Sequence, residues 1–201
     1  MKRQIRLEHV IAFADAIFAF STTFLAISIE VPDLAQNLTP AHLISRLLES
    51  LPEFEIYMIS FFVIGIYWIA YHQIFNNIVG SHYITTWLTL VFLFFITLIP
   101  VANNLLSGYD SYQIVFVLNA LVLGIAGSLI PIIWLHATKN KLIDEDLGQS
   151  EIHNILLESI IPPVVFLLST LVSVIDVQIA YYFWLVIIPA KIIVRKKYHF
   201  P

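Results

Sequence analysis

Long apolar segments separated by short polar connections dominate the hydrophobic pattern of this 201-residue chain. Each segment is close to the roughly 20 residues that an α-helix needs to cross a bilayer. We therefore predict six membrane-spanning helices, at about Val10–Val31, Phe54–Ile78, Tyr83–Leu106, Tyr112–Leu135, Ile152–Val174 and Val177–Val194. The longest connection contains Thr39 and Pro40, which favour the start of a short amphipathic helix at the membrane interface.

The first apolar segment has a second pattern within it. At heptad spacing, one face of the predicted helix carries His9, Phe13, Ala16, Phe20, Thr23, Ile27 and Glu30. This alternation of four and three residues is the seam that a helix presents to partner helices. A helix surrounded by lipid needs neither a seam nor a charge, yet this one also carries Asp15. We therefore expect it to be the functional helix, packed centrally, with the other spans built around it.

The composition supports a membrane protein and excludes several other classes. The chain is 59% hydrophobic and 12% charged, whereas soluble domains have about 25% charged residues. No polar stretch is long enough for a soluble domain, so we treat 1–201 as one all-α transmembrane domain. Because the chain has no cysteine, disulfides, thiol catalysis and cysteine metal sites are excluded. The first span is longer than the apolar core of a signal peptide, about 7–15 residues, and we expect it to be retained.

Lysine and arginine gather on one side of the predicted helices. If the amino terminus is cytoplasmic, the inner side receives Lys2, Arg3, Arg6, Lys139, Lys141, Lys191, Arg195, Lys196 and Lys197. Only Arg46 then lies outside. The positive-inside rule therefore predicts a multi-pass protein with both termini in the cytoplasm. Glu158 is expected near the inner headgroups.

Asp15 needs a partner, because an aspartate at the centre of a membrane helix costs roughly 2.5–3.5 kcal/mol, and somewhat less off-centre. It lies about 8 Å into the first span, and His72 lies about 9 Å above the inner end of the second. Trp68 is one turn above His72 and needs a hydrogen-bond acceptor. We expect Asp15 to bind His72, Trp68 or both, between helices or between subunits. We favour a structural cluster that holds the first helix without touching a permeant species.

Phe20, Thr23 and Ile27 share one face of the first span in mid-membrane. If several copies met at an axis, Phe20 and Ile27 would form dry constrictions, and Thr23 would form a ring of hydroxyl oxygens. Glu30, one ring further out, would gather cations at the mouth. The alternative is a packing seam without a pore, and periodicity alone favours that alternative modestly.

Other function classes have less support. A proton-coupled transporter or proton pathway could use Asp15 and His72 as relay groups, but further polar groups in the membrane are few, chiefly Thr22 and Thr23. The chain shows no metal cluster, phosphate loop or nucleophile arrangement. We therefore expect neither an enzyme, nor a cofactor, nor a nucleic-acid partner.

The stretch FADAIFAFSTTFLAISIEVP resembles the first helix of the transmembrane protein 175 family, potassium channels of endosomes and lysosomes with prokaryotic homologues. The family motif is R-x-x-x-F-S-D, followed by an apolar helix that ends in a proline. Phe13 and Asp15 match it. His9 stands in place of the arginine and Ala14 in place of the serine, and Arg6 lies one turn early.

The next two spans extend the resemblance. SFFVIGIYWIAYHQIF is similar to the family's second helix, through Ser60, Phe61, Ile64, Trp68, His72 and Phe75. WLTLVFLFFITLIPVANNLL is similar to the third, through Trp87 and Pro100. A weaker pattern continues to the end of the chain.

The resemblance implies six helices per subunit and a homotetramer whose central pore is lined by the first helix. It implies passive, potassium-favouring cation flux, with the narrowest ring at Phe20 and with Thr23 and Ile27 beyond it. It also implies that Phe13 and Asp15 contact Trp68 and His72. A phenylalanine is bulkier than the usual branched aliphatic residue there, which implies a low conductance or a closed state. The single-repeat, prokaryotic form suggests the plasma membrane, with potassium ions and the lipid bilayer as partners.

Overall fold

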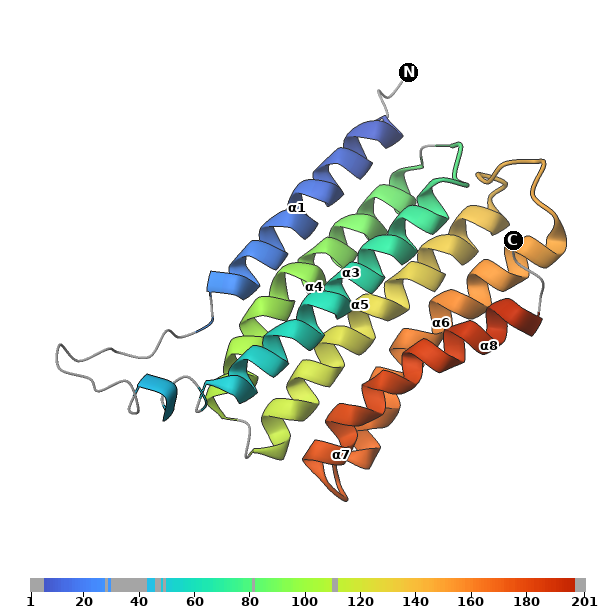
Figure 1. Cartoon of the computed structure of the whole chain (residues 1–201). Helices are drawn as coiled ribbons and strands as arrows, with labels where there is room; N and C mark the ends of the chain where they lie inside the picture. Colours follow the sequence, from blue (N-terminus) through green and yellow to red (C-terminus); the bar gives the residue numbers. More distant parts are fainter. Residues whose placement is uncertain are drawn as a thin grey trace.

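The computed structural model describes residues 6–27, 29, 43–45, 48, 50–80, 82–109 and 112–197, of which 52, 53 and 197 are described by their backbone alone. Helices that run side by side form an elongated bundle (Figure 1). They are α1 (Leu7–Ile27), α3 (Leu51–Phe75), α4 (Tyr83–Gly108), α5 (Gln113–Lys139), α6 (Gln149–Val172), α7 (Val177–Tyr182), the 3₁₀ turn η1 (Phe183–Val186) and α8 (Ile187–Lys197).

Within the described ranges, six helical spans are long and apolar enough to cross a membrane. The sixth, Val177–Lys196, is composed of α7, η1 and α8. The prediction of an all-helical, multi-pass membrane protein with six spans is confirmed. Helix ends differ from the predicted ones by a few residues; α5, for example, continues to Lys139. The helix predicted at Thr39 and Pro40 lies outside the described residues.

The core of the bundle is aromatic. Phe92 of α4 is fully buried and packs against Phe18 of α1 and against Tyr67 and Tyr71 of α3, with ring centroids 5.9, 6.4 and 5.9 Å away. Aromatic pairs at such separations contribute about 0.5–1.5 kcal/mol beyond the area they bury. These contacts join α1, α3 and α4 into one unit, so the position of α1 is set by side chains far along the sequence.

Glycine lets α3 and α5 approach closely where Tyr67 meets Gly127. A Cβ atom at Gly127 would lie 2.7 Å from the Tyr67 hydroxyl oxygen, and that hydroxyl donates to the Leu123 carbonyl at 2.6 Å. Small residues at helix contacts are typical of membrane proteins, where packing and hydrogen bonds replace the hydrophobic effect. Gly127 therefore makes room for a buried interhelical hydrogen bond.

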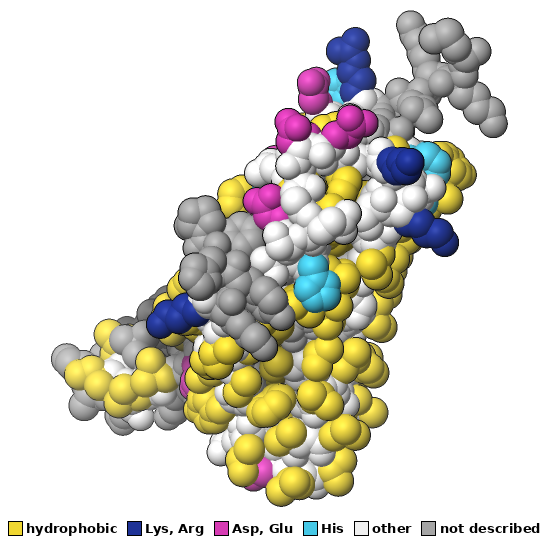
Figure 2. Space-filling view, turned by 90° about the vertical axis from the view of Figure 1, so that its right-hand side faces the viewer, with side chains coloured by type: hydrophobic (Ala, Val, Ile, Leu, Met, Phe, Trp, Pro, Cys, Tyr) yellow, Lys and Arg dark blue, Asp and Glu magenta, His cyan; other side chains and the backbone are white. Residues whose placement is uncertain are grey.

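Charge is distributed unevenly over the outer surface. On the face shown in Figure 2, charged and histidine side chains gather toward one end and hydrophobic side chains cover most of the remainder. Such a surface is suited to lipid along its length and to water at the charged end. At that end, an Ile78–Ile143 bridge joins the α3–α4 and α5–α6 connections, and His82, just before α4, lies 3.1 Å from His136 in the last turn of α5.

Candidate functional site

One face of α1 is buried within the chain. Its residues are Val10, Ala14, Phe18, Ser21 and Leu25, spaced by four or three positions. They pack toward α3 and α4, the neighbours of α1 in the bundle (Figure 1). This spacing places the buried residues on a single stripe of a 3.6-residue helix, which fixes how α1 is rotated about its own axis.

The predicted seam of α1 lies on roughly the opposite face. In the single chain its described members are all exposed: His9, Phe13, Ala16, Phe20, Thr23 and Ile27. Phe20 is 57% exposed and Ile27 is 70% exposed. Glu30 lies outside the described residues. The fold thus leaves the whole described seam free to meet lipid, water or another copy of the chain.

Two threonines next to each other on α1 use their hydroxyl hydrogens within the helix. The Thr23 hydroxyl donates to the Ala19 carbonyl at 2.8 Å, and the Thr22 hydroxyl is within bonding distance of the Phe18 and Ala19 carbonyls. A hydroxyl has one donor and two acceptor lone pairs. Thr23 therefore presents an oxygen that acts only as an acceptor, which suits a cation or the oxygen-bound hydrogens of water.

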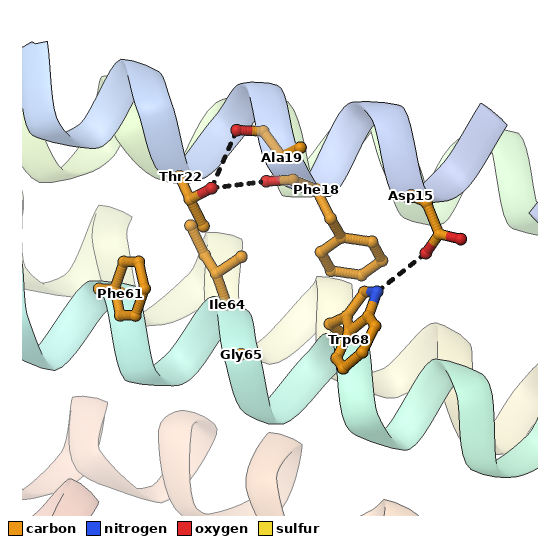
Figure 3. Close-up of a pocket in the computed structure, with 8 residues that line it drawn as sticks. All are labelled: Asp15, Phe18, Ala19, Thr22, Phe61, Ile64, Gly65 and Trp68. Atoms are coloured by element: carbon orange, nitrogen blue, oxygen red, sulfur yellow. Dashed lines mark hydrogen bonds between the residues drawn. The ribbon is translucent and has the colours of Figure 1, made fainter. Parts of the chain in front are cut away.

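Asp15 lies between α1 and α3, away from the seam. Its Oδ1 accepts a hydrogen bond from Trp68 Nε1 at 2.8 Å (Figure 3). The same oxygen lies 2.8 Å from His72 Nε2, and the Trp68 and His72 rings meet edge to face with centroids 4.6 Å apart. The structure thus brings Asp15, Trp68 and His72 together as a half-exposed cluster, which we call the Asp15 cluster.

Phe13 is expected on the seam from its spacing and beside this cluster from the family resemblance, and in the single chain it lies on the seam. Its ring is half-exposed, and within the described part of the chain it makes no hydrogen bond or ring contact to Trp68 or His72. Residues two apart on a helix point in different directions. The bond to Asp15 therefore turns Phe13 away from α3.

A groove of about 400 Å³ separates α1 from α3 above the Asp15 cluster. Asp15 and Trp68 lie at one end of it and Phe61 at the other (Figure 3). Gly65 lines the groove, and a Cβ atom there would meet nothing within 4 Å. The groove walls are mostly apolar, so the carboxylate is its main polar feature.

Comparison with known proteins finds similar sequences and structures. A sequence model described as the endosomal/lysosomal potassium channel TMEM175 matches residues 9–100, which include most of α1 and α4 and all of α3. A potassium channel of Streptomyces collinus is 28% identical over 64% of this chain and 63% of that protein. A potassium channel of Chamaesiphon minutus is 25% identical over 84% of this chain and 85% of that protein. The match therefore spans less than two thirds of the Streptomyces protein.

Over residues 9–100 the chain is thus similar to the TMEM175 family. Solved structures agree on the fold. The crystal structure of a lysosomal potassium-selective channel TMEM175 homolog from Chamaesiphon minutus has a TM-score of 0.78 and 21% identity, and the match covers 96% of this chain and 98% of that one. A variant of the potassium channel MtTMEM175, in complex with a nanobody fusion protein, has a TM-score of 0.63 and 18% identity over 97% of this chain and 93% of that one.

The structure also shows a charged pair that sequence reasoning did not identify. Glu158 of α6, expected near the inner headgroups, has a side chain that is only 2% exposed, and its Oε1 lies 3.2 Å from Arg195 Nε of α8. A signal was present, because an ionisable residue within an apolar span requires a partner. Matching residues of neighbouring spans by their depth in the membrane gives Lys191 and Arg195 as candidate partners of Glu158.

Proposed function

We propose that this chain is the subunit of a homotetrameric, potassium-favouring cation channel in which the α1 seam lines a central pore. The observation that carries the proposal is the exposure of the whole described seam opposite the buried face of α1. Sequence similarity supports it, because the similar Streptomyces and Chamaesiphon proteins are potassium channels. Four copies of α1 around one axis would cover the seam.

The seam residues then form rings along the pore. Phe20 and Ile27 would be about 10 Å apart along the axis, with Thr23 between them. Apolar rings stop ions by excluding water when they are narrow, whereas oxygen rings replace part of a hydration shell. The acceptor oxygen of Thr23 suits the second role. Glu30 would gather cations further out, and Phe20 would be the narrowest ring.

Phe24 adds to the proposed constriction. Its ring centroid lies 4.5 Å from that of Phe20, one turn earlier on the same helix. A packed neighbour limits the rotamers that the Phe20 ring can reach. We infer that the pair holds Phe20 in one orientation, so that the narrow ring is stiff rather than adaptable.

The Asp15 cluster would position α1 rather than touch the ion. Its three groups lie at the contact of α1 with α3, and the seam lies on another face of α1. Two hydrogen bonds to one carboxylate oxygen fix the rotation and the height of α1 against α3. A pore lined by several copies of α1 requires that the same residue of each copy lies at the same height, and this cluster supplies one such constraint. Phe13 would belong to the pore side, at the inner end of the seam.

The remaining features of the proposal concern its setting. The chain would act as one domain, 1–201, in the plasma membrane, with both termini in the cytoplasm. Its partners would be potassium ions, the lipid bilayer and three further copies of itself. Ion flux through such a pore is passive and involves no covalent chemistry, so the protein would not be an enzyme.

Reconstitution into planar bilayers or liposomes with opposed potassium and sodium gradients tests the proposal. We expect a current whose reversal potential lies toward the equilibrium potential of potassium and does not change when a pH gradient is imposed. A current that saturates and follows the pH gradient would instead support the proton-coupled alternative. Absence of current from a folded tetramer, with the Phe20→Ala variant equally silent, would contradict the channel.

A further inference from the structure

Glu158 is a buried carboxylate outside the proposed pore. It lies in α6, and the Arg195 side chain that pairs with it is 55% exposed. A buried carboxylate with one partner contributes little net stability, because its desolvation offsets the attraction. Since the pair adds little stability, the exposed Arg195 side chain is available for another role.

The geometry of the pair leaves most of the guanidinium available. Both carboxylate oxygens lie 3.2 Å from the same atom, Arg195 Nε. A fork-shaped pair would instead use Nε together with one Nη group. Within the described part of the chain, no hydrogen bond from the Nη groups is found, so their N–H donors are left for a further acceptor.

A second cation lies beside the pair. Lys191 is one turn before Arg195 on α8 and interacts electrostatically with both Glu158 and Arg195. With all three groups ionised, two cations and one carboxylate give this group a net charge of +1. An acceptor carrying one negative charge would therefore complete the cluster.

The surroundings indicate where that acceptor comes from. Isoleucines 188, 192 and 193 of α8 are exposed, so the cations lie beside an apolar surface. Figure 1 shows α8 at the opposite edge of the bundle from α1. If α1 lines the pore, as the proposed function has it, α8 faces the surrounding lipid. The cations also lie in the last turns of the sixth span, at the depth of headgroups.

We propose that Lys191 and Arg195 bind the headgroup phosphate of an anionic phospholipid. The phosphate oxygens would accept hydrogen bonds from the Arg195 Nη groups and from Lys191 Nζ, and the acyl chains would lie along the exposed isoleucines of α8. Glu158 is a positioning residue: it holds Nε and so directs the Nη groups away from α6. The negative charge of Glu158 repels the negatively charged headgroup phosphate.

This assignment gives opposite predictions for the two members of one ion pair. Each basic side chain near an anionic surface contributes a factor of about five in affinity. Arg195→Gln should therefore reduce the preference for anionic lipid about fivefold. Glu158→Gln keeps an acceptor for Nε but removes the opposing charge, and it should raise that preference about fivefold. If the ion pair served only stability, both changes would weaken the pair and would not shift the lipid preference in opposite directions.

Native mass spectrometry of the purified tetramer tests this with phosphatidylglycerol and phosphatidylcholine of the same acyl chains, in equimolar mixture. We expect the wild type to retain phosphatidylglycerol in preference, and Lys191→Met, which leaves the ion pair intact, to lose that preference. Lys141→Gln, which removes a basic residue from the α5–α6 connection, is the matched control and should behave as wild type. Inorganic phosphate at millimolar concentration should not displace the lipid.

Equal retention of the two lipids by the wild type, or loss of phosphatidylglycerol from both Arg195→Gln and Glu158→Gln, would overturn the proposal. Displacement by phosphate alone would show an anion site rather than a lipid site, and would overturn it too. The readout is bound lipid, not ion flux. A failure here therefore leaves the channel proposal standing, and a silent channel that still selects phosphatidylglycerol would separate the two in the other direction.

Discussion

Replacing Trp68 by phenylalanine removes the indole N–H that donates to Asp15 at 2.8 Å and keeps most of the aromatic surface. Interhelical hydrogen bonds in membrane proteins contribute about 0.6 kcal/mol on average and about 1.7 kcal/mol at most. Because the Asp15 side chain is half-exposed, we take about 1 kcal/mol for each of its two bonds. Trp68→Phe should then lower the free energy of unfolding by about 1 kcal/mol, and Asp15→Ala by about 2 kcal/mol.

The double variant distinguishes this bond from unrelated effects of the two changes. Once Asp15 is gone, Trp68 has no acceptor to lose, so Asp15→Ala with Trp68→Phe should cost about 2 kcal/mol rather than 3. The coupling of about 1 kcal/mol is the quantity to measure. Unfolding can be followed by the loss of helical circular dichroism as denaturing detergent is added, at fixed protein concentration, because oligomers unfold in a concentration-dependent way.

Trp87 supplies the matched control. It is an exposed tryptophan of α4, far from Asp15 in the sequence and outside the Asp15 cluster. Trp87→Phe should add to Asp15→Ala without coupling. If Trp68→Phe were also additive with Asp15→Ala to within about 0.5 kcal/mol, the bond would have no energetic role and the positioning of α1 by this cluster would be refuted.

Three further changes test other contacts. Phe20→Ala should raise potassium flux into liposomes, because it widens the proposed narrowest ring, and equal flux would argue against a constriction there. The control is Leu171→Ala, at an exposed position of α6. Gly127→Ala should lower the free energy of unfolding by about 1–3 kcal/mol, since its Cβ would lie 2.7 Å from the Tyr67 hydroxyl oxygen. Gly65→Ala, whose Cβ would meet nothing within 4 Å, should be neutral or stabilising by up to about 1 kcal/mol; a loss as large as that at Gly127 would contradict the packing described here.

The two faces of α1 could be predicted from the sequence because a strong periodicity fixes which residues share a face. The partners of Asp15 could be predicted because the rise per residue is constant, so residues on antiparallel spans can be matched by depth. Trp68 and His72 were found in this way. These two regularities are local, and they hold before any packing is known.

Rotation about the helix axis could not be predicted where a span is apolar on every side. The Arg195–Glu158 pair depends on how α8 is turned against α6, and the close contact of Tyr67 with Gly127 depends on the same property of α3 and α5. The motif suggested that Phe13 and Asp15 act together, yet a spacing of two residues points them in different directions. Tertiary packing decides such cases, and the sequence pattern alone does not contain it.

The absence of cysteine from the sequence makes a direct test of the pore possible, because a cysteine introduced at Thr23 is the only thiol of the subunit. A small, positively charged thiol reagent that does not cross membranes should reduce potassium flux through Thr23→Cys and Ile27→Cys channels, and Leu171→Cys, exposed on α6, should be unaffected. Full flux through both seam variants after treatment, in a preparation that conducts potassium, would contradict a pore lined by α1.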